Sequence, residues 1–192
     1  MTPILYIMIQ AFVTLLFAAA LLHKLADIRQ FITVFRDYRI VPQTGTKAAA
    51  YMVLLAEGVA VLLLIIRPAE GGILAASLLS AYALGMGVNI MRGRVYIDCG
   101  CHWQMQRQGQ KNAKHMLSLN LIFRNMGLAV LALTLYLTPL YLTIAPPIGA
   151  DYLLAVSAAI FFFTAYMVAD ILIMQARVIR QYFGRQYKQG AL

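Results

Sequence analysis

The chain has 192 residues, of which 62% are hydrophobic and only 12% are charged. A soluble domain of this length could not hide so much apolar surface from water, and two cysteines are too few for a disulfide-stapled secreted module. The net charge of +9 then points to membrane topology and anionic lipid before any nucleic acid. We expect an integral membrane protein that contacts the lipid bilayer and no nucleic acid.

Five apolar runs approach the roughly 20 residues that a helix needs to cross about 30 Å of hydrocarbon. They predict an all-α fold, a polytopic membrane bundle of about five transmembrane helices that forms a single domain over 1–192. The expected spans lie near 4–22, 48–66, 72–91, 117–137 and 152–174.

The segment 24–40, after the first span, has apolar residues at helical spacing with basic residues between them. This pattern predicts an amphipathic helix that lies in the membrane interface and ends at Pro42. A continuation of the first span that bends at the surface fits the same pattern, and both interpretations stay open.

Basic residues are distributed unevenly among the connecting segments. Outside the spans, every lysine and arginine except Arg67 lies after the first span, after the third span or in the C-terminal tail. The positive-inside bias therefore predicts a periplasmic N-terminus, with the C-terminus and both basic connections on the cytoplasmic side.

The two cysteines, Cys99 and Cys101, are separated by one glycine just after the third span. A disulfide needs α-carbons about 5.5–6 Å apart, whereas an extended three-residue segment spans roughly 7 Å, so the chain must bend at Gly100. Strained and exposed disulfides are the readily exchanged kind. Cys99 and Cys101 are therefore candidate catalytic residues of a thiol–disulfide oxidoreductase.

The surroundings of this pair leave other interpretations open. Arg92 and Arg94 would favour a thiolate, and Asp98 would oppose it. A metal site could form if His102 and His115 joined the cysteines, although we assign no metal. The pair could also be two interfacial cysteines without chemistry.

Several polar side chains lie within or at the ends of the spans. Counting 1.5 Å per residue places Glu57 roughly 14 Å and Arg124 roughly 10 Å from the cytoplasmic side, which predicts an ion pair between them. Glu57 either belongs to such a structural pair or lines a proton or quinone path. Asn125 adjoins Arg124. His23 and Lys24 end the first span on the cytoplasmic side, where His23 either anchors the span in the interface or serves proton transfer near the cysteines.

Three stretches, 23–31, 89–101 and 123–128, resemble the MauE family of methylamine utilisation proteins, which is related to the DoxX-like membrane proteins. The most specific piece is the run Asp-Cys-Gly-Cys after Arg-Gly-Arg. The resemblance covers residues 4–137 well and the fifth span more loosely.

This resemblance implies a protein of the bacterial inner membrane that supports maturation of the methylamine dehydrogenase small subunit, by processing, export or disulfide formation. It implies a thioredoxin-like partner of the MauD type and assigns the exchanging thiols to Cys99 and Cys101. Because the client is periplasmic and the charge pattern places the cysteines on the cytoplasmic side, we expect a thiol–disulfide relay across the membrane. A quinone-linked disulfide oxidoreductase and a non-catalytic scaffold for the partner are the alternatives, and quinone is the one cofactor considered.

Overall fold

The computed structural model describes residues 3–94, 119–141 and 146–189, with side chains as far as residue 173. Every regular element in these ranges is helical, and five of the helices are long and apolar enough to cross a membrane. The predicted all-α polytopic fold is therefore confirmed. In chain order the elements are α1 (Pro3–Ala26), α2 (Ile28–Asp37), the short 3-10 helix η1 (Gln43–Gly45), α3 (Thr46–Ile66), α4 (Pro68–Met91), α5 (Leu119–Tyr141) and α6 (Gly149–Gln189).

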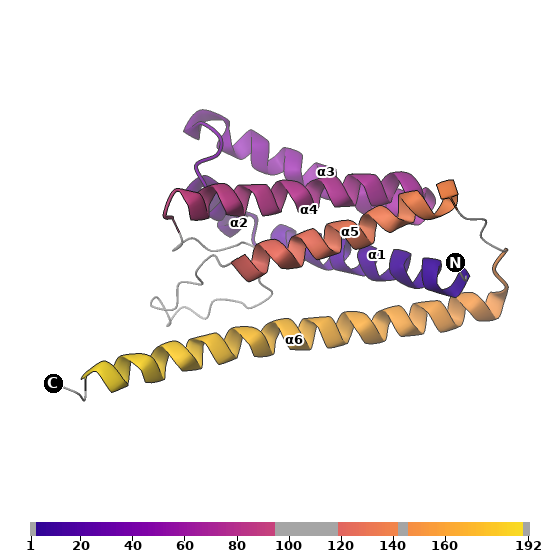
Figure 1. The fold of residues 1–192 in the computed structure, drawn as a ribbon. Coiled ribbons are helices and arrows are strands. Elements are labelled where there is room, and N and C mark those ends of the chain that lie inside the picture. The colour runs from indigo at the N-terminus through magenta and orange to yellow at the C-terminus, as the bar shows by residue number, and fades with distance from the viewer. Residues whose placement is uncertain (1–2, 95–118, 142–145, 190–192) are drawn as a thin grey trace.

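The five long helices lie side by side and alternate in direction (Figure 1). α4 packs between α3 and α5, while α1 contacts α3, α5 and α6. One end of the bundle carries α2, the start of α3, the end of α4 and the start of α5 (Figure 1). We call this the basic end, because it holds Arg29, Arg36, Arg39, Arg92 and Arg94.

Helix boundaries differ from the predicted spans at several points. α1 continues to Ala26, so Lys24 lies inside the helix rather than beyond its end. α4 begins at Pro68 instead of residue 72, because proline suits the first position of a helix. α6 continues to Gln189, and its 41 residues measure about 60 Å at 1.5 Å per residue. Its C-terminal end therefore extends past the other helices at the basic end (Figure 1).

Asp27 separates the end of α1 from the start of α2 at Ile28, with a non-helical φ of −135° and ψ of 71°. The side chain of Asp27 accepts a hydrogen bond from the backbone N–H of Gln30 at 3.0 Å, which caps the start of α2. The helix ends at Asp37, earlier than predicted, and Arg39 turns the chain with a φ of 47°. The new start at Asp27 lets α2 lie against α3 instead of extending α1.

Glycines allow α4 to approach both of its neighbours closely. A Cβ on Gly71 would lie 2.4 Å from the backbone nitrogen of Leu64 in α3, and one on Gly72 would lie 2.6 Å from the carbonyl oxygen of Ala132 in α5. Phe17 of α1 joins Leu64 in the buried core. α3, α4 and α5 are therefore a tightly packed unit. By contrast, α6 contacts α1 extensively and has few close backbone contacts with α5.

Candidate functional site

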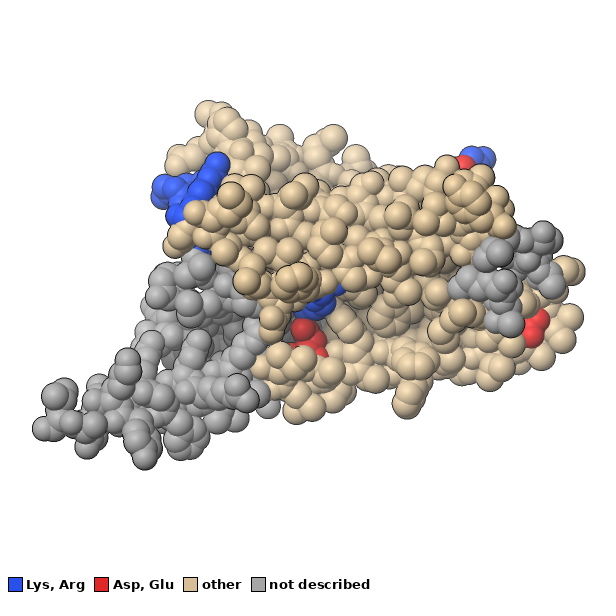
Figure 2. All heavy atoms as spheres, in the orientation of Figure 1, with Lys and Arg blue, Asp and Glu red and all other residues tan. Residues whose placement is uncertain are grey.

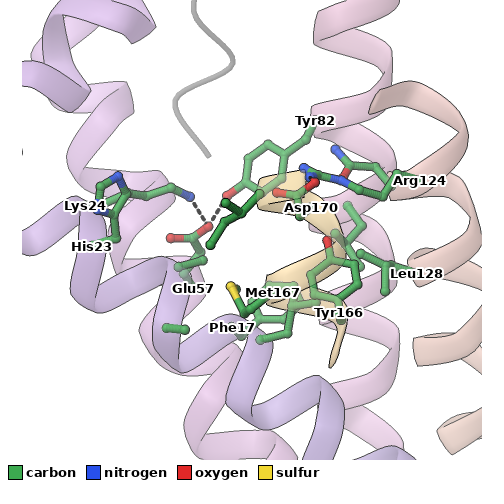
Figure 3. Close-up of a pocket in the computed structure, with 16 residues that line it drawn as sticks. Phe17, His23, Lys24, Glu57, Tyr82, Arg124, Leu128, Tyr166, Met167 and Asp170 are labelled. Atoms are coloured by element: carbon green, nitrogen blue, oxygen red, sulfur yellow. Dashed lines mark hydrogen bonds and ion pairs between the residues drawn. The ribbon is translucent and has the colours of Figure 1, made fainter. Parts of the chain in front are cut away.

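A buried ion pair joins α1 to α3 through Lys24 Nζ and Glu57 Oε1. The two side chains are only 5% and 1% exposed. The hydroxyl of Tyr82 in α4 donates a hydrogen bond to the same carboxylate oxygen at 2.6 Å. Lys24 Nζ also lies 4.9 Å from the ring centroid of Tyr82 and 5.3 Å from that of Phe31 in α2, within cation–π range. The Lys24–Glu57–Tyr82 cluster thus connects α1, α3 and α4 (Figure 3), and Lys24 also contacts α2 through Phe31.

A second ion pair bridges α5 and α6. Arg124 Nη1 donates to Asp170 Oδ1 at 2.8 Å, and the side chains are 20% and 27% exposed. The flank of the bundle is otherwise almost free of charge, and basic and acidic atoms lie together in a hollow there (Figure 2). The pair therefore sits at a partly open seam between two helices whose backbones approach each other little.

The predicted ion pair between Glu57 and Arg124 is wrong. Both residues lie at similar depth, but the direction of a side chain around its helix decides its partner, and a depth count ignores direction. α1 packs on α3 and brings Lys24 to Glu57, whereas α5 faces α6 and brings Arg124 to Asp170. Lys24 is buried within the bundle, where it is paired with Glu57.

Both ion pairs line one cavity of about 80 Å³ between α1, α3, α4, α5 and α6 (Figure 3). His23 and Asn125 line it as well, together with apolar residues such as Phe17 and Leu128. The space is large enough for several water molecules. Glu57 Oε2 and Asn125 Nδ2 are buried and have no hydrogen-bond partner within the described ranges. This polar cavity is the candidate functional site, since buried polar atoms are normally satisfied.

A second space of about 220 Å³ lies beneath α2. Its walls are apolar and aromatic, with Phe31, Phe35 and Tyr38 on one side and Met86 on the other. Lys24 and Tyr82 border both this space and the polar cavity. The Lys24–Glu57–Tyr82 cluster therefore separates a polar compartment from an apolar one.

The Arg-Gly-Arg run forms the C-terminal cap of α4. Arg94 N–H donates to the carbonyl of Asn89, and Gly93 N–H donates to that of Ile90, each at 2.9 Å. Gly93 has a φ of 70°, and this combination is a Schellman motif, for which glycine is the favoured residue. Arg92 Nη1 donates to the carbonyl of Arg39 at 3.4 Å. The chain is therefore turned sharply at Gly93, just before the cysteine motif in sequence.

Several predicted site residues lie outside the described ranges. They are Asp98, Cys99 and Cys101, and the same holds for His102 and His115 of the metal interpretation. In the described ranges, no group of three or more His, Cys, Asp or Glu side chains is arranged to hold a metal ion. The first described range ends at Arg94 and the next begins at Leu119, and both residues lie at the basic end.

The structure brings together five of the predicted residues and adds others. His23, Lys24, Glu57, Arg124 and Asn125 all line the polar cavity, whereas Arg92 and Arg94 lie at the end of α4. The sequence reasoning did not single out the tyrosine of α4 or the seam between α5 and α6. A hydroxyl in the middle of an apolar span was the available signal for the tyrosine. No sequence pattern predicts that two helices will pack loosely.

Comparison with known proteins identifies one family. Residues 2–138 match the family described as methylamine utilisation protein MauE. This range covers α1 to α4 and α5 as far as Thr138, and it excludes α6, which carries Asp170. No solved structure matches the chain.

Three relatives are each named methylamine utilization protein MauE. The protein of Paracoccus denitrificans is 32% identical over 129 residues, 66% of either chain. That of Paracoccus versutus is 34% identical over 133 residues, 68% of either chain. That of Methylorubrum extorquens is 34% identical over 150 residues, 77% of this chain and 75% of the relative. The matched region is thus about two thirds of the length of both Paracoccus relatives.

Proposed function

The chain belongs to the MauE family, and on this premise we propose that it is a multi-pass protein of the bacterial inner membrane that takes part in methylamine utilisation. We propose that its task is to support maturation of the methylamine dehydrogenase small subunit through thiol–disulfide exchange at Cys99 and Cys101. The partner in this exchange is a thioredoxin-like protein of the MauD type.

The exchange follows ordinary thiol chemistry. A thiolate of the pair attacks a disulfide of the partner, and a mixed disulfide forms as one partner thiolate leaves. The second cysteine then attacks the mixed disulfide and releases the partner as a dithiol. Two electrons pass from the Cys99–Cys101 pair to the partner, and the pair becomes a disulfide. The reverse sequence oxidises the partner.

The observation that carries this proposal is the capped end of α4. The Schellman motif at Gly93 stops the helix, so the Cys-Gly-Cys motif follows a rigid and tightly packed helix at one end of the bundle. A connection between two spanning helices is reachable from the aqueous side at which they end, which exchange with another protein requires. The arginines of the basic end support a cytoplasmic location for that side and a periplasmic N-terminus.

The Lys24–Glu57–Tyr82 cluster supports this chemistry by holding the bundle together. Glu57 Oε1 is engaged by two donors on two other helices, which favours a structural role for that oxygen. Charges inside a membrane are expensive and need such partners. The cluster therefore fixes α1, α3 and α4 relative to one another.

Trapping of the mixed disulfide tests the exchange. Cys101→Ser leaves one thiol without its resolving partner, so a covalent complex with the thioredoxin-like protein should accumulate on non-reducing gels and disappear with reductant. Cys99→Ser is the matched control and tells which cysteine attacks. The absence of any mixed disulfide in both variants would contradict the proposal. If the double serine variant supported normal growth on methylamine, the scaffold alternative would replace it.

A further inference from the structure

An apolar groove of about 450 Å³ lies between α1, α5 and α6, next to the polar cavity. Phe12, Leu131 and Phe162 are among its walls, and Tyr166 borders both spaces. The ring of Tyr166 meets that of Phe12 edge-on, with centroids 6.0 Å apart. On α1 the groove lining begins at Met8, and the cavity lining reaches Lys24, a distance of about 24 Å at 1.5 Å per residue.

The groove opens sideways, toward the lipid. α5 and α6 have few close backbone contacts, and in the spanning part of α6 only 6% of the residues are buried. Phe162 is 52% exposed although it lines the groove. A hydrophobic molecule can therefore enter from the bilayer between the two helices without passing through water.

The inner end of this path is polar but electrically balanced. Lys24 and Arg124 are matched by Glu57 and Asp170. Glu57 Oε2 lacks a donor, and Asn125 Nδ2 lacks an acceptor, among the described residues. A neutral head group that both accepts and donates hydrogen bonds would satisfy the two atoms, whereas an added anion or cation would upset the balance.

We propose that the groove and the cavity together bind an isoprenoid quinone, with the ring in the polar cavity and the isoprenoid chain along the apolar groove. Quinone oxygens accept a hydrogen bond from Asn125, and in the quinol form they donate one to Glu57. A phospholipid fits less well, because its charged phosphate belongs at the membrane interface and not beside a balanced set of buried charges.

The ring lies toward the basic end, where α4 leads into the cysteine segment and α5 begins. Resting on the proposed function, the quinone is the oxidant of the Cys99–Cys101 pair. Two thiols become one disulfide, and their two electrons and two protons convert the quinone to the quinol.

Photolabelling tests the binding site. The full chain in lipid nanodiscs is irradiated with an azido-ubiquinone of short isoprenoid chain, and the labelled peptides are mapped by mass spectrometry. We expect label on peptides of α1, α5 and α6, which excess decylubiquinone removes and excess phosphatidylglycerol does not. Label spread evenly over all helices, or displaced equally by phospholipid, would overturn the proposal.

Two neighbouring residues of α6 provide matched variants. Ala169→Phe places a ring in the groove and should lower specific labelling at least tenfold. Val168→Phe adds similar bulk at a 54% exposed position outside the groove lining and should label like the wild type. Asn125→Leu removes the donor at the polar end and should weaken competition by decylubiquinone about tenfold. Equal labelling of Ala169→Phe and wild type, with both folded by circular dichroism, would contradict the site.

The double variant Cys99→Ser/Cys101→Ser separates this inference from the proposed function. Quinone binding needs no thiol, so this variant should label like the wild type. Specific labelling in the wild type without any mixed disulfide in the trapping experiment would remove the thiol role and keep the quinone site. A trapped mixed disulfide without specific labelling would remove the quinone site and keep the thiol role.

Discussion

Removal of one partner from the Lys24–Glu57 pair should destabilise the bundle far more than removal of both. Lys24→Met leaves a carboxylate that is 1% exposed with Tyr82 as its remaining hydrogen-bond donor. Breaking a buried pair in this way costs about 3–5 kcal/mol. Glu57→Gln should cost less, because the amide oxygen still accepts from Tyr82 and the ammonium group keeps its contacts with two aromatic rings.

The double variant Lys24→Met/Glu57→Leu removes both charges and should recover most of the loss, since apolar replacement of a buried pair is often neutral. Arg67 and Glu70 offer a control, because this pair is 67% and 56% exposed. Glu70→Gln should change stability by less than about 1 kcal/mol.

Unfolding by SDS in mixed micelles, followed by circular dichroism, measures these differences, and immunoblots of membranes measure accumulation. A double variant whose loss equals the sum of the losses of Lys24→Met and Glu57→Leu would refute the reasoning. If Glu57→Gln accumulated normally but no longer supported thiol–disulfide exchange, Glu57 would act in the exchange reaction and not in stabilising the bundle.

Three further substitutions probe the seam, the helix cap and the close helix contact. Arg124→Gln should lower stability by roughly 0.6 kcal/mol, the average for hydrogen bonds between spans, because the pair is partly exposed. The exchanged pair Arg124→Asp/Asp170→Arg should recover part of this loss in the same SDS titration. Gly93→Ala should cost about 1–2 kcal/mol at a φ of 70° and slow mixed-disulfide formation, while Gly93→Asn should behave nearly like the wild type. Gly72→Ala should cost about 1–3 kcal/mol because its Cβ would lie 2.6 Å from a carbonyl oxygen of α5, whereas Gly127→Ala, with nothing within 4 Å, should leave the melting temperature unchanged.

The number and order of the spanning helices could be predicted because long apolar runs alone specify them. The ends of the helices were harder to predict, since they depend on local capping residues. Asp27 ends the continuity of α1 and α2 through one side-chain hydrogen bond, and Pro68 starts α4 before the apolar run becomes obvious. The length of α6 beyond residue 174 also escaped prediction, because a polar helix outside the membrane leaves no hydropathy signal.

Five polar residues of the cavity could be found from the sequence, but their partners could not. Charged side chains in apolar spans stand out, which is why Glu57 and Arg124 were recognised. Their pairing depends on which helix faces which, and the contacts of α1 with α3 and of α5 with α6 decide it. The groove depends on the loose packing between α5 and α6, which is a property of the assembled bundle and of no single segment.

The most direct measurement is thiol labelling of Cys99 and Cys101 with a maleimide that cannot cross membranes, in intact cells and in inverted vesicles, with and without reductant. The proposed relay predicts labelling only after reduction and only in inverted vesicles, because the pair is a disulfide on the cytoplasmic side. Thiols that label fully without reductant would contradict a redox-active pair. Labelling in intact cells would contradict the orientation.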